Sequence, residues 1–162
     1  MICLADGNWA NPVVVSAEGT SCYPRFNGDG TKLVWTQTVA GFSDIYILVG
    51  GTAQSVTSDG VSWYADFSPN GDWLAYQSNG ELRIMSLKDS ESECVVKGVD
   101  LICPPVWVTK GLVGRIYFVS RSADGTTNLY VVSPRARDKD LSGVAIITAN
   151  CASVFLTRGF IS

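Results

Sequence analysis

The stretch FSPNGDWLAYQSNGELRIMSL, residues 67–87, alternates short apolar runs with residues that favour tight turns. Pro69 presets φ for a turn, and Asn70–Gly71 tolerates the left-handed backbone conformation that returns a chain into an antiparallel partner. Asn79–Gly80 supplies a two-residue hairpin connection. The stretch therefore predicts three consecutive antiparallel strands, and a unit punctuated in this way seldom stands alone.

The unit recurs on both sides of this stretch. Residues 22–37 and 103–120 superimpose on residues 63–78, at spacings of 41 and 40 residues. One equivalent position holds an aromatic side chain in each unit: Phe26, Phe67 and Trp107. Third strands are predicted in residues 43–49, 80–87 and 127–134, and fourth strands in residues 53–60, 93–100 and 143–150. A four-stranded unit with a period of about 40 residues is typical of a β-propeller blade.

The whole chain, residues 1–162, is predicted to be one all-β propeller segment of four-stranded antiparallel blades. Helical periodicity is almost absent, and Val, Ile and aromatic runs alternate with Gly, Asn, Asp and Ser clusters. The predicted units are a half blade (1–20), blades at 21–61, 62–101 and 102–150, and the start of another at 151–162. An insertion is expected around residues 135–140. About four blades per chain make a partial or half propeller.

These units resemble the repeats of TolB-like β-propellers, which are distant relatives of WD-repeat proteins. The family's turn of an aromatic residue followed by Ser-Pro-Asp-Gly matches FSPNG (67–71), and LAY (74–76) and LRI (82–84) follow at the expected strands. The first unit has NGDG (27–30) without the proline, and the third has the poorer turn VTKG (108–111). The resemblance implies the propeller fold. It leaves function open, since such propellers occur in transport-complex subunits, peptidase-gating domains and polysaccharide-lyase relatives.

Composition narrows the classes of partner. The chain has 46% hydrophobic and 17% charged residues with a net charge of −3, as a folded globular protein does. Its 12 Lys and Arg residues are scattered, which predicts no nucleic-acid binding. Its longest apolar runs fall far short of the roughly 20 residues that span a bilayer, which predicts no membrane insertion. The N-terminus lacks a secretory signal, so we expect a cytoplasmic protein, although a mature periplasmic fragment would look the same.

Catalysis has few residue types to draw on. The sequence contains no His, which excludes His-based nucleophile systems, imidazole metal sites and the commonest general base. Asp59 and Asp66 are close in sequence, but aspartates beside Gly and Ser usually belong to turns. We therefore predict a non-catalytic module with no catalytic residues. The alternative is the propeller portion of a larger hydrolase, peptidase or polysaccharide-lyase-like enzyme, whose Gly-x-Ser-x-Gly elbow is not in this sequence.

Three of the five cysteines, Cys22, Cys103 and Cys151, share one repeat position, with Trp63 at the fourth. A thiolate cluster could hold a soft metal at such a level of a propeller. The alternative is that a small apolar side chain fits this position, as buried free Cys often does. We favour the second interpretation because Trp63 interrupts the set and three ligands leave a structural zinc site incomplete. The prediction is therefore no metal and no cofactor.

Ligand binding is expected at one mouth of the propeller, where loops from successive blades gather. These loops are residues 16–23, 57–64 and 97–104, together with 38–44 and 121–127. The candidate ligand-binding residues form an aromatic and charged group suited to a peptide or sugar, hence to a protein or small-molecule partner: Tyr23, Arg25, Phe42, Trp63, Tyr64 and Asp66. Packing between blades is the alternative role for at least half of them.

Assembly follows from the blade count. The equivalent aromatic residues, which include Phe155, are expected to pack between adjacent blades. Four blades are the lower limit for a closed ring, and an open ring exposes strand edges and apolar blade faces. Two chains related by a two-fold axis would complete an eight-bladed ring, so we expect a homodimer. The alternatives are a four-bladed monomer and an excised fragment.

Overall fold

The computed structural model describes residues 2–4, 13–16, 18–110 and 113–148, and these residues are nearly all β-structure. Sheet 1 consists of β3 (Thr20–Phe26), β4 (Lys32–Val39), β5 (Phe42–Val49) and β6 (Thr52–Ser55). Sheet 2 consists of β7 (Ser62–Phe67), β8 (Trp73–Ser78), β9 (Glu81–Ser86) and β10 (Ser92–Lys97), followed by β14 (Lys139–Asp140). Sheet 3 consists of β11 (Val106–Lys110), β12 (Val113–Arg121), β13 (Thr127–Val132) and β15 (Ala145–Thr148). An N-terminal pair, β1 (Ile2–Leu4) and β2 (Val13–Ser16), precedes them.

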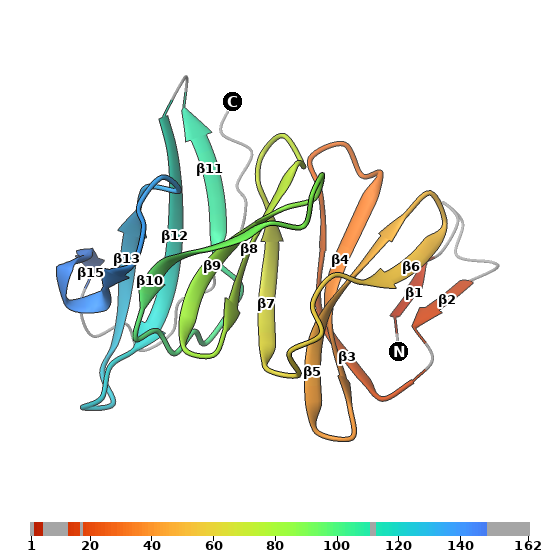
Figure 1. Ribbon diagram of the computed structural model, residues 1–162, viewed down its shortest axis with the longest axis horizontal. Helices are drawn as coiled ribbons and strands as arrows, with labels where there is room; N and C mark the ends of the chain where they lie inside the picture. The colour runs from red at the N-terminus through yellow and green to blue at the C-terminus, as the bar shows by residue number, and fades with distance from the viewer. Residues whose placement is uncertain (1, 5–12, 17, 111–112, 149–162) are drawn as a thin grey trace.

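The strands of sheets 1 and 3 and the first four strands of sheet 2 follow the order of the chain and pair antiparallel, which confirms the predicted all-β class with four-stranded antiparallel sheets. Figure 1 shows the sheets side by side in chain order, from the N-terminal pair to β15. The first strands of neighbouring sheets contact each other, β3 against β7 and β7 against β11. These first strands therefore form the inner side of the assembly. Among the described residues, no helix is long and apolar enough to cross a bilayer.

The turn near the start of residues 67–87 forms as its residue types predict. Gly71 has φ +72°, and its N–H donates to the Ser68 carbonyl at 2.9 Å. The Ser68 hydroxyl accepts the backbone N–H of Trp73 at 3.0 Å and donates to Asn70 at 2.7 Å. Asn79 and Gly80 both have positive φ, at 48° and 71°, as a type I′ hairpin requires.

Apolar side chains fill the spaces between successive sheets. Leu74 and Phe67 on sheet 2 pack against Val34, Ile45 and Ile47 of sheet 1. The opposite face of sheet 2 packs against sheet 3, with a core that contains Ile84, Val95, Trp107, Phe118 and Tyr130. Sheet 2 has a neighbouring sheet on each side and is therefore covered on both faces, as a blade within a propeller is.

The predicted burial of the repeated aromatic residues is confirmed at two positions and wrong at a third. Phe67 is 0% exposed and Trp107 is 7% exposed. Phe26 is 52% exposed, because the described strands before sheet 1, β1 and β2, leave about half of its side chain uncovered. Phe155 lies outside the described residues.

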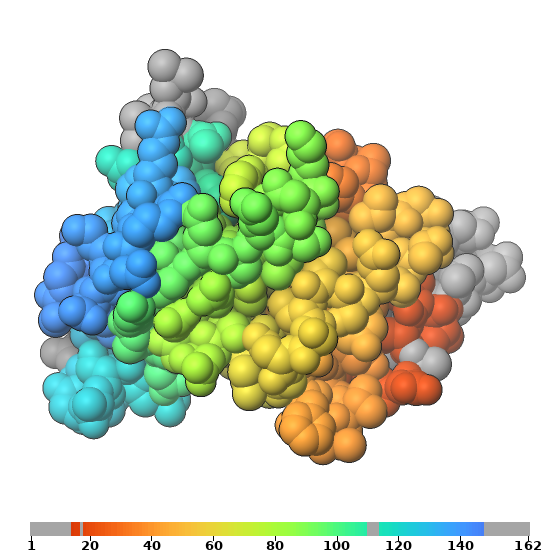
Figure 2. All heavy atoms as spheres, viewed as in Figure 1, coloured from red at the N-terminus to blue at the C-terminus, as the bar shows by residue number. Residues whose placement is uncertain are grey.

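The segment expected as an insertion adds a strand to sheet 2. β14 pairs in parallel with Val96 and Lys97 of β10, and one turn of 3₁₀ helix (Leu141–Gly143) follows it. Lys97 forms an ion pair of 3.0 Å with Asp138, which belongs to the same segment. The blue spheres of this segment lie against the green spheres of sheet 2 in Figure 2. The outer edge of β10 is therefore partly paired, an outcome that the repeat pattern did not predict.

Candidate functional site

The inner strands of sheets 1 and 2 carry matching irregularities. The register of β3 shifts between Cys22 and Arg25, and that of β7 shifts between Trp63 and Asp66. The residues inside these shifts, Tyr23 and Tyr64, have φ of 58° and 59°, in the left-handed region that bulky residues rarely adopt. A bulge re-aims side chains, and backbone strain of this kind clusters at functional sites.

Three of the predicted ligand-binding residues come together here, and we call Tyr23, Trp63 and Tyr64 the aromatic cluster. The ring centroids of Tyr23 and Tyr64 lie 4.7 Å apart at 59°, and those of Trp63 and Tyr64 lie 6.2 Å apart at 44°. Tyr23 is 36% exposed, and the other two are half-buried. Burial, then hydrogen bonding to Tyr23, raises the pKa of the Tyr64 phenol. Its hydroxyl therefore stays protonated near neutral pH and can both donate and accept.

The other three predicted residues lie in different surroundings. Asp66 is 1% exposed, so its side chain is not on the surface. The Arg25 guanidinium donates to the neighbouring carbonyl of Pro24 at 3.1 Å. Phe42, at the start of β5, is 68% exposed and lies against Gly60, where an added Cβ would come within 2.9 Å of its ring.

Two of the repeat-equivalent cysteines lie beside the aromatic cluster. Cys22 and Cys103 are half-buried, and both are close enough to Tyr64 to influence its phenol. Burial raises the pKa of the Cys22 thiol, which favours the neutral form. Within the described residues, no group of three or more His, Cys, Asp or Glu side chains is placed to hold a metal ion. Cys151 lies outside them.

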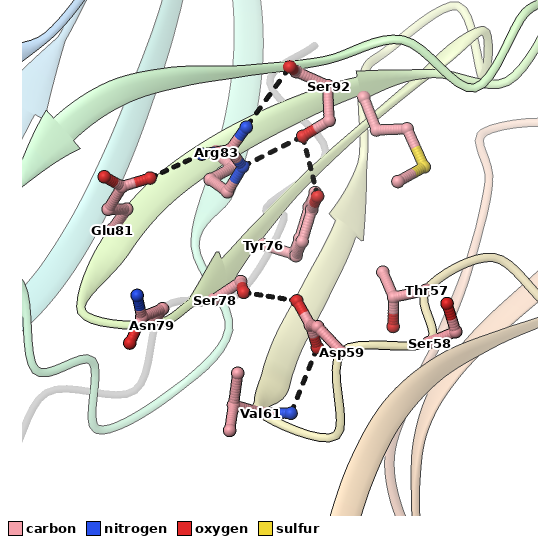
Figure 3. A pocket seen from close by; sticks show the side chains of 11 residues that line it. Thr57, Ser58, Asp59, Val61, Tyr76, Ser78, Asn79, Glu81, Arg83 and Ser92 are labelled. Atoms are coloured by element: carbon pink, nitrogen blue, oxygen red, sulfur yellow. Dashed lines mark hydrogen bonds and ion pairs between the residues drawn. The ribbon is translucent and has the colours of Figure 1, made fainter.

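A second site, which the sequence-based predictions missed, is a groove of about 520 Å³ on the sheet 1 side of sheet 2 (Figure 3). One wall is the connection between β6 and β7, which contributes Thr57, Ser58 and Asp59. The other wall is the face of β8, β9 and β10. The polar residues of this second wall are Tyr76, Ser78, Glu81, Arg83 and Ser92.

Asp59 is fixed at one end of the groove. Its carboxylate accepts the Ser78 hydroxyl at 2.5 Å, the Val61 N–H at 3.0 Å and the Ser62 hydroxyl at 2.9 Å. Burial by itself would raise the pKa of Asp59, but the hydrogen bonds from Ser78, Val61 and Ser62 together outweigh it and lower the pKa. The carboxylate is therefore ionised at neutral pH.

Arg83 is fixed at the other end. Its Nε donates to the Ser92 hydroxyl at 3.0 Å and its Nη2 to the Ser92 carbonyl at 3.2 Å, while Nη1 is paired with Glu81. The Tyr76 hydroxyl lies 2.8 Å from the hydroxyl oxygen of Ser92. Figure 3 shows these side chains converging on the groove from three strands. Both ends of the groove are thus organised by contacts within the protein.

Antiparallel four-stranded sheets packed face to face, with their first strands on the inner side, define a partial β-propeller. Comparison with solved structures identifies the type. The chain is similar to a putative TolB from Agrobacterium tumefaciens, with a TM-score of 0.63 and 18% identity over 85% of this chain and 52% of that one. It is also similar to TolB from Acinetobacter baumannii, with a TM-score of 0.62 and 15% identity over 76% of this chain and 32% of that one. The chain therefore has the fold of TolB-like β-propellers.

Further comparisons limit what can be concluded from the similarity to TolB structures. An oligogalacturonate lyase, solved in complex with manganese, matches with a TM-score of 0.55 and 16% identity over 77% of this chain and 38% of that one. The chain spans from about a third to about half of the length of these three structures. No protein-family model and no curated protein matches the sequence. Because identities below 20% accompany both TolB and a lyase, the likeness shows the fold alone.

Proposed function

We propose that this chain is a non-catalytic binding segment of a TolB-like propeller, and that it holds an extended segment of a protein partner against the aromatic cluster. The observation that carries the proposal is the pairing of Tyr23 and Tyr64 across two inner strands, each at a strained bulge. Tyr and Trp supply rigid contact area with polar tips, and they are enriched where proteins bind one another.

The geometry around the cluster supports a peptide rather than a deep-pocket ligand. The three rings come from adjacent inner strands and remain partly exposed. The Tyr64 N–H donates to the Thr36 hydroxyl of sheet 1 at 3.2 Å, which holds the bulge against its neighbour. A rigid, aromatic surface of this kind lowers the entropy that binding costs.

The test selects ligands from a random peptide library displayed on phage, using wild-type protein and Trp63→Ala. We expect peptides enriched on the wild type to lose at least tenfold in affinity for Trp63→Ala and for Tyr23→Ala. Phe42→Ala is the matched control, because it removes a ring of 68% exposure outside the cluster. Equal binding by all three variants would contradict the proposal, as would an absence of enriched peptides.

The same proposal includes a second copy of the chain as a partner that completes the ring. The half-exposed Phe26, whose equivalents in sheets 2 and 3 are buried by a neighbouring sheet, supports this assembly. Light scattering coupled to size exclusion is expected to give twice the 17.4 kDa chain mass. Phe26→Asp should shift the protein to the single mass, and the control Phe42→Asp should not. A wild-type species of 17.4 kDa that persists on concentration would refute the dimer.

A further inference from the structure

The three sheets carry an equivalent cross-strand pair, and sheet 2 differs from its neighbours. In each sheet the repeated aromatic residue of the first strand pairs with an apolar residue of the second strand: Phe26 with Leu33, Phe67 with Leu74 and Trp107 with Ile116. The residue two positions after this apolar residue forms a cross-strand pair with a residue of the third strand. The three pairs are Trp35–Tyr46, Tyr76–Arg83 and Phe118–Tyr130.

In sheets 1 and 3 this pair is a stack of two aromatic rings. The centroids of Trp35 and Tyr46 are 5.8 Å apart, and those of Phe118 and Tyr130 are 5.3 Å apart. The pocket beside the pair of sheet 1 has a volume of about 180 Å³. The groove beside Tyr76 and Arg83 has about 520 Å³, almost three times as much. Replacement of a stacked ring by a guanidinium therefore accompanies an open groove.

The groove keeps its shape through contacts within the protein. Arg83 is held by Glu81 and by two atoms of Ser92, and the Ser92 hydroxyl also meets Tyr76. On the facing wall, Asp44 accepts both the Thr57 hydroxyl and the Gly60 N–H, which fixes the connection between β6 and β7. A ligand would therefore meet walls that are already ordered, so binding would cost little rearrangement.

The chemistry of the lining favours a neutral ligand with many hydroxyl groups. The groove is lined by the hydroxyls of Tyr76, Ser78 and Ser92, by one guanidinium and by two carboxylates. Arg83 is already paired with a carboxylate, so it offers little to an anion. Three groups donate to the Asp59 carboxylate, and the Ser62 hydroxyl lies within hydrogen-bond distance of both of its oxygens, so a ligand hydroxyl would donate to an oxygen that it shares with one of these groups.

We propose that this groove binds a short neutral carbohydrate, whose hydroxyls donate to Asp59 and exchange hydrogen bonds with the serine and tyrosine hydroxyls. Its volume lies within the roughly 300–1,000 Å³ of small-molecule sites. Met85 and Val61 add apolar lining that can contact the C–H faces of a sugar ring. The site is separate from the aromatic cluster, and the proposal stands independently of peptide binding there.

The test is a titration of the whole, isotope-labelled chain, followed by amide chemical shifts. The probes are cellobiose, maltose and sucrose, each taken to about 10 mM, which reveals dissociation constants in the millimolar range. We expect at least one of them to shift the amides of Val61, Asn79 and Ser92. The proposal is overturned if none of the three sugars shifts these amides, or if glucuronate, the anionic control, shifts them at lower concentration than every neutral sugar.

Variants separate this groove from other surfaces. Arg83→Tyr restores the aromatic pair of sheets 1 and 3, and it should weaken the sugar at least tenfold by filling the groove. Arg121→Tyr makes the same change at an exposed position on sheet 3 and should leave affinity unchanged. Asp59→Asn keeps the side-chain shape, provides a second test if Arg83→Tyr fails to fold, and should weaken the sugar about tenfold. Undiminished binding by a folded Arg83→Tyr or by Asp59→Asn would refute the assignment.

Discussion

The two interfaces that flank sheet 2 use the same strand positions in different ways. Towards sheet 3, Phe118 is 0% exposed and Tyr130 is 3% exposed, stacked in a continuous apolar core. Towards sheet 1, the corresponding pair is Tyr76 and Arg83, and the apolar core gives way to a polar groove. The repeat thus needs apolar packing at one end of each interface to hold neighbouring sheets together, while the other end can be opened for recognition.

The largest effect is expected at the filled interface between sheets 2 and 3. Tyr130→Arg places on sheet 3 the residue type that sheet 2 tolerates. Tyr130 is 3% exposed. In sheet 3 the residue equivalent to Glu81 is Asn128, so the new guanidinium would have no carboxylate to pair with, and the ring stacking would be lost. An unpaired buried charge is expected to lower the free energy of unfolding by about 3 kcal/mol or more. Urea denaturation measures it, and a loss below about 1 kcal/mol would contradict the equivalence.

The second prediction concerns the apolar end of the interface between sheets 1 and 2. Gly71 has φ +72°, and a Cβ there would meet the Asn27 amide of sheet 1 at 3.0 Å. Gly71→Val should therefore cost about 1–3 kcal/mol in the free energy of unfolding. Gly125→Val is matched, because Gly125 has φ +84° with no atom within 4 Å. If both variants lose equal stability, strain alone accounts for the cost and the inter-sheet contact adds nothing.

The third prediction uses the charge at the open end of the same interface. The folded-state pKa of Asp59 is lowered, so its hydrogen bonds stabilise the protein above the ordinary Asp pKa of about 4, and this contribution is lost as pH falls through the folded pKa. Asp59→Asn should flatten the acid limb of the stability curve by less than about 1 kcal/mol, because the side chain is solvated. Urea denaturation at several pH values checks this. Asp100→Asn, which removes a 3.8 Å exposed ion pair, is the control, and an equal change there would count against the Asp59 network.

The fourth prediction exchanges the residue that distinguishes sheet 2 from its neighbours. Arg83→Tyr is the converse of Tyr130→Arg, since it gives sheet 2 the ring of its neighbours. The groove has room for the ring, and Tyr76 is positioned to stack on it. We expect the free energy of unfolding to change by less than about 1.5 kcal/mol. A loss comparable to that of Tyr130→Arg would show that Arg83 supports the fold rather than the groove.

The parts of the candidate site that follow the repeat could be predicted from the sequence. The parts that depart from the repeat could not. Tyr23 and Tyr64 occupy equivalent positions, so the repeat alone predicted that they lie at one level of neighbouring sheets. The burial of Asp66 and the separate position of Phe42 depend on the bulges and on Gly60, which no spacing reveals. The signal for the groove was present in Arg83, a charged residue where the other units have Tyr46 and Tyr130, but its meaning needed the strand register.

The all-β class, the four-stranded unit and the positions of its turns can be predicted from the residues alone, because they follow from local φ preferences and a period of about 40 residues. Which of the equivalent residues are buried depends on the packing of whole sheets, since burial requires a neighbouring sheet: Phe67 has one, and Phe26 is left half-exposed. The formation of the groove also depends on the tertiary structure. Asp59 and Ser92 are far apart in sequence, and they line one cavity because the connection after sheet 1 lies across the face of sheet 2.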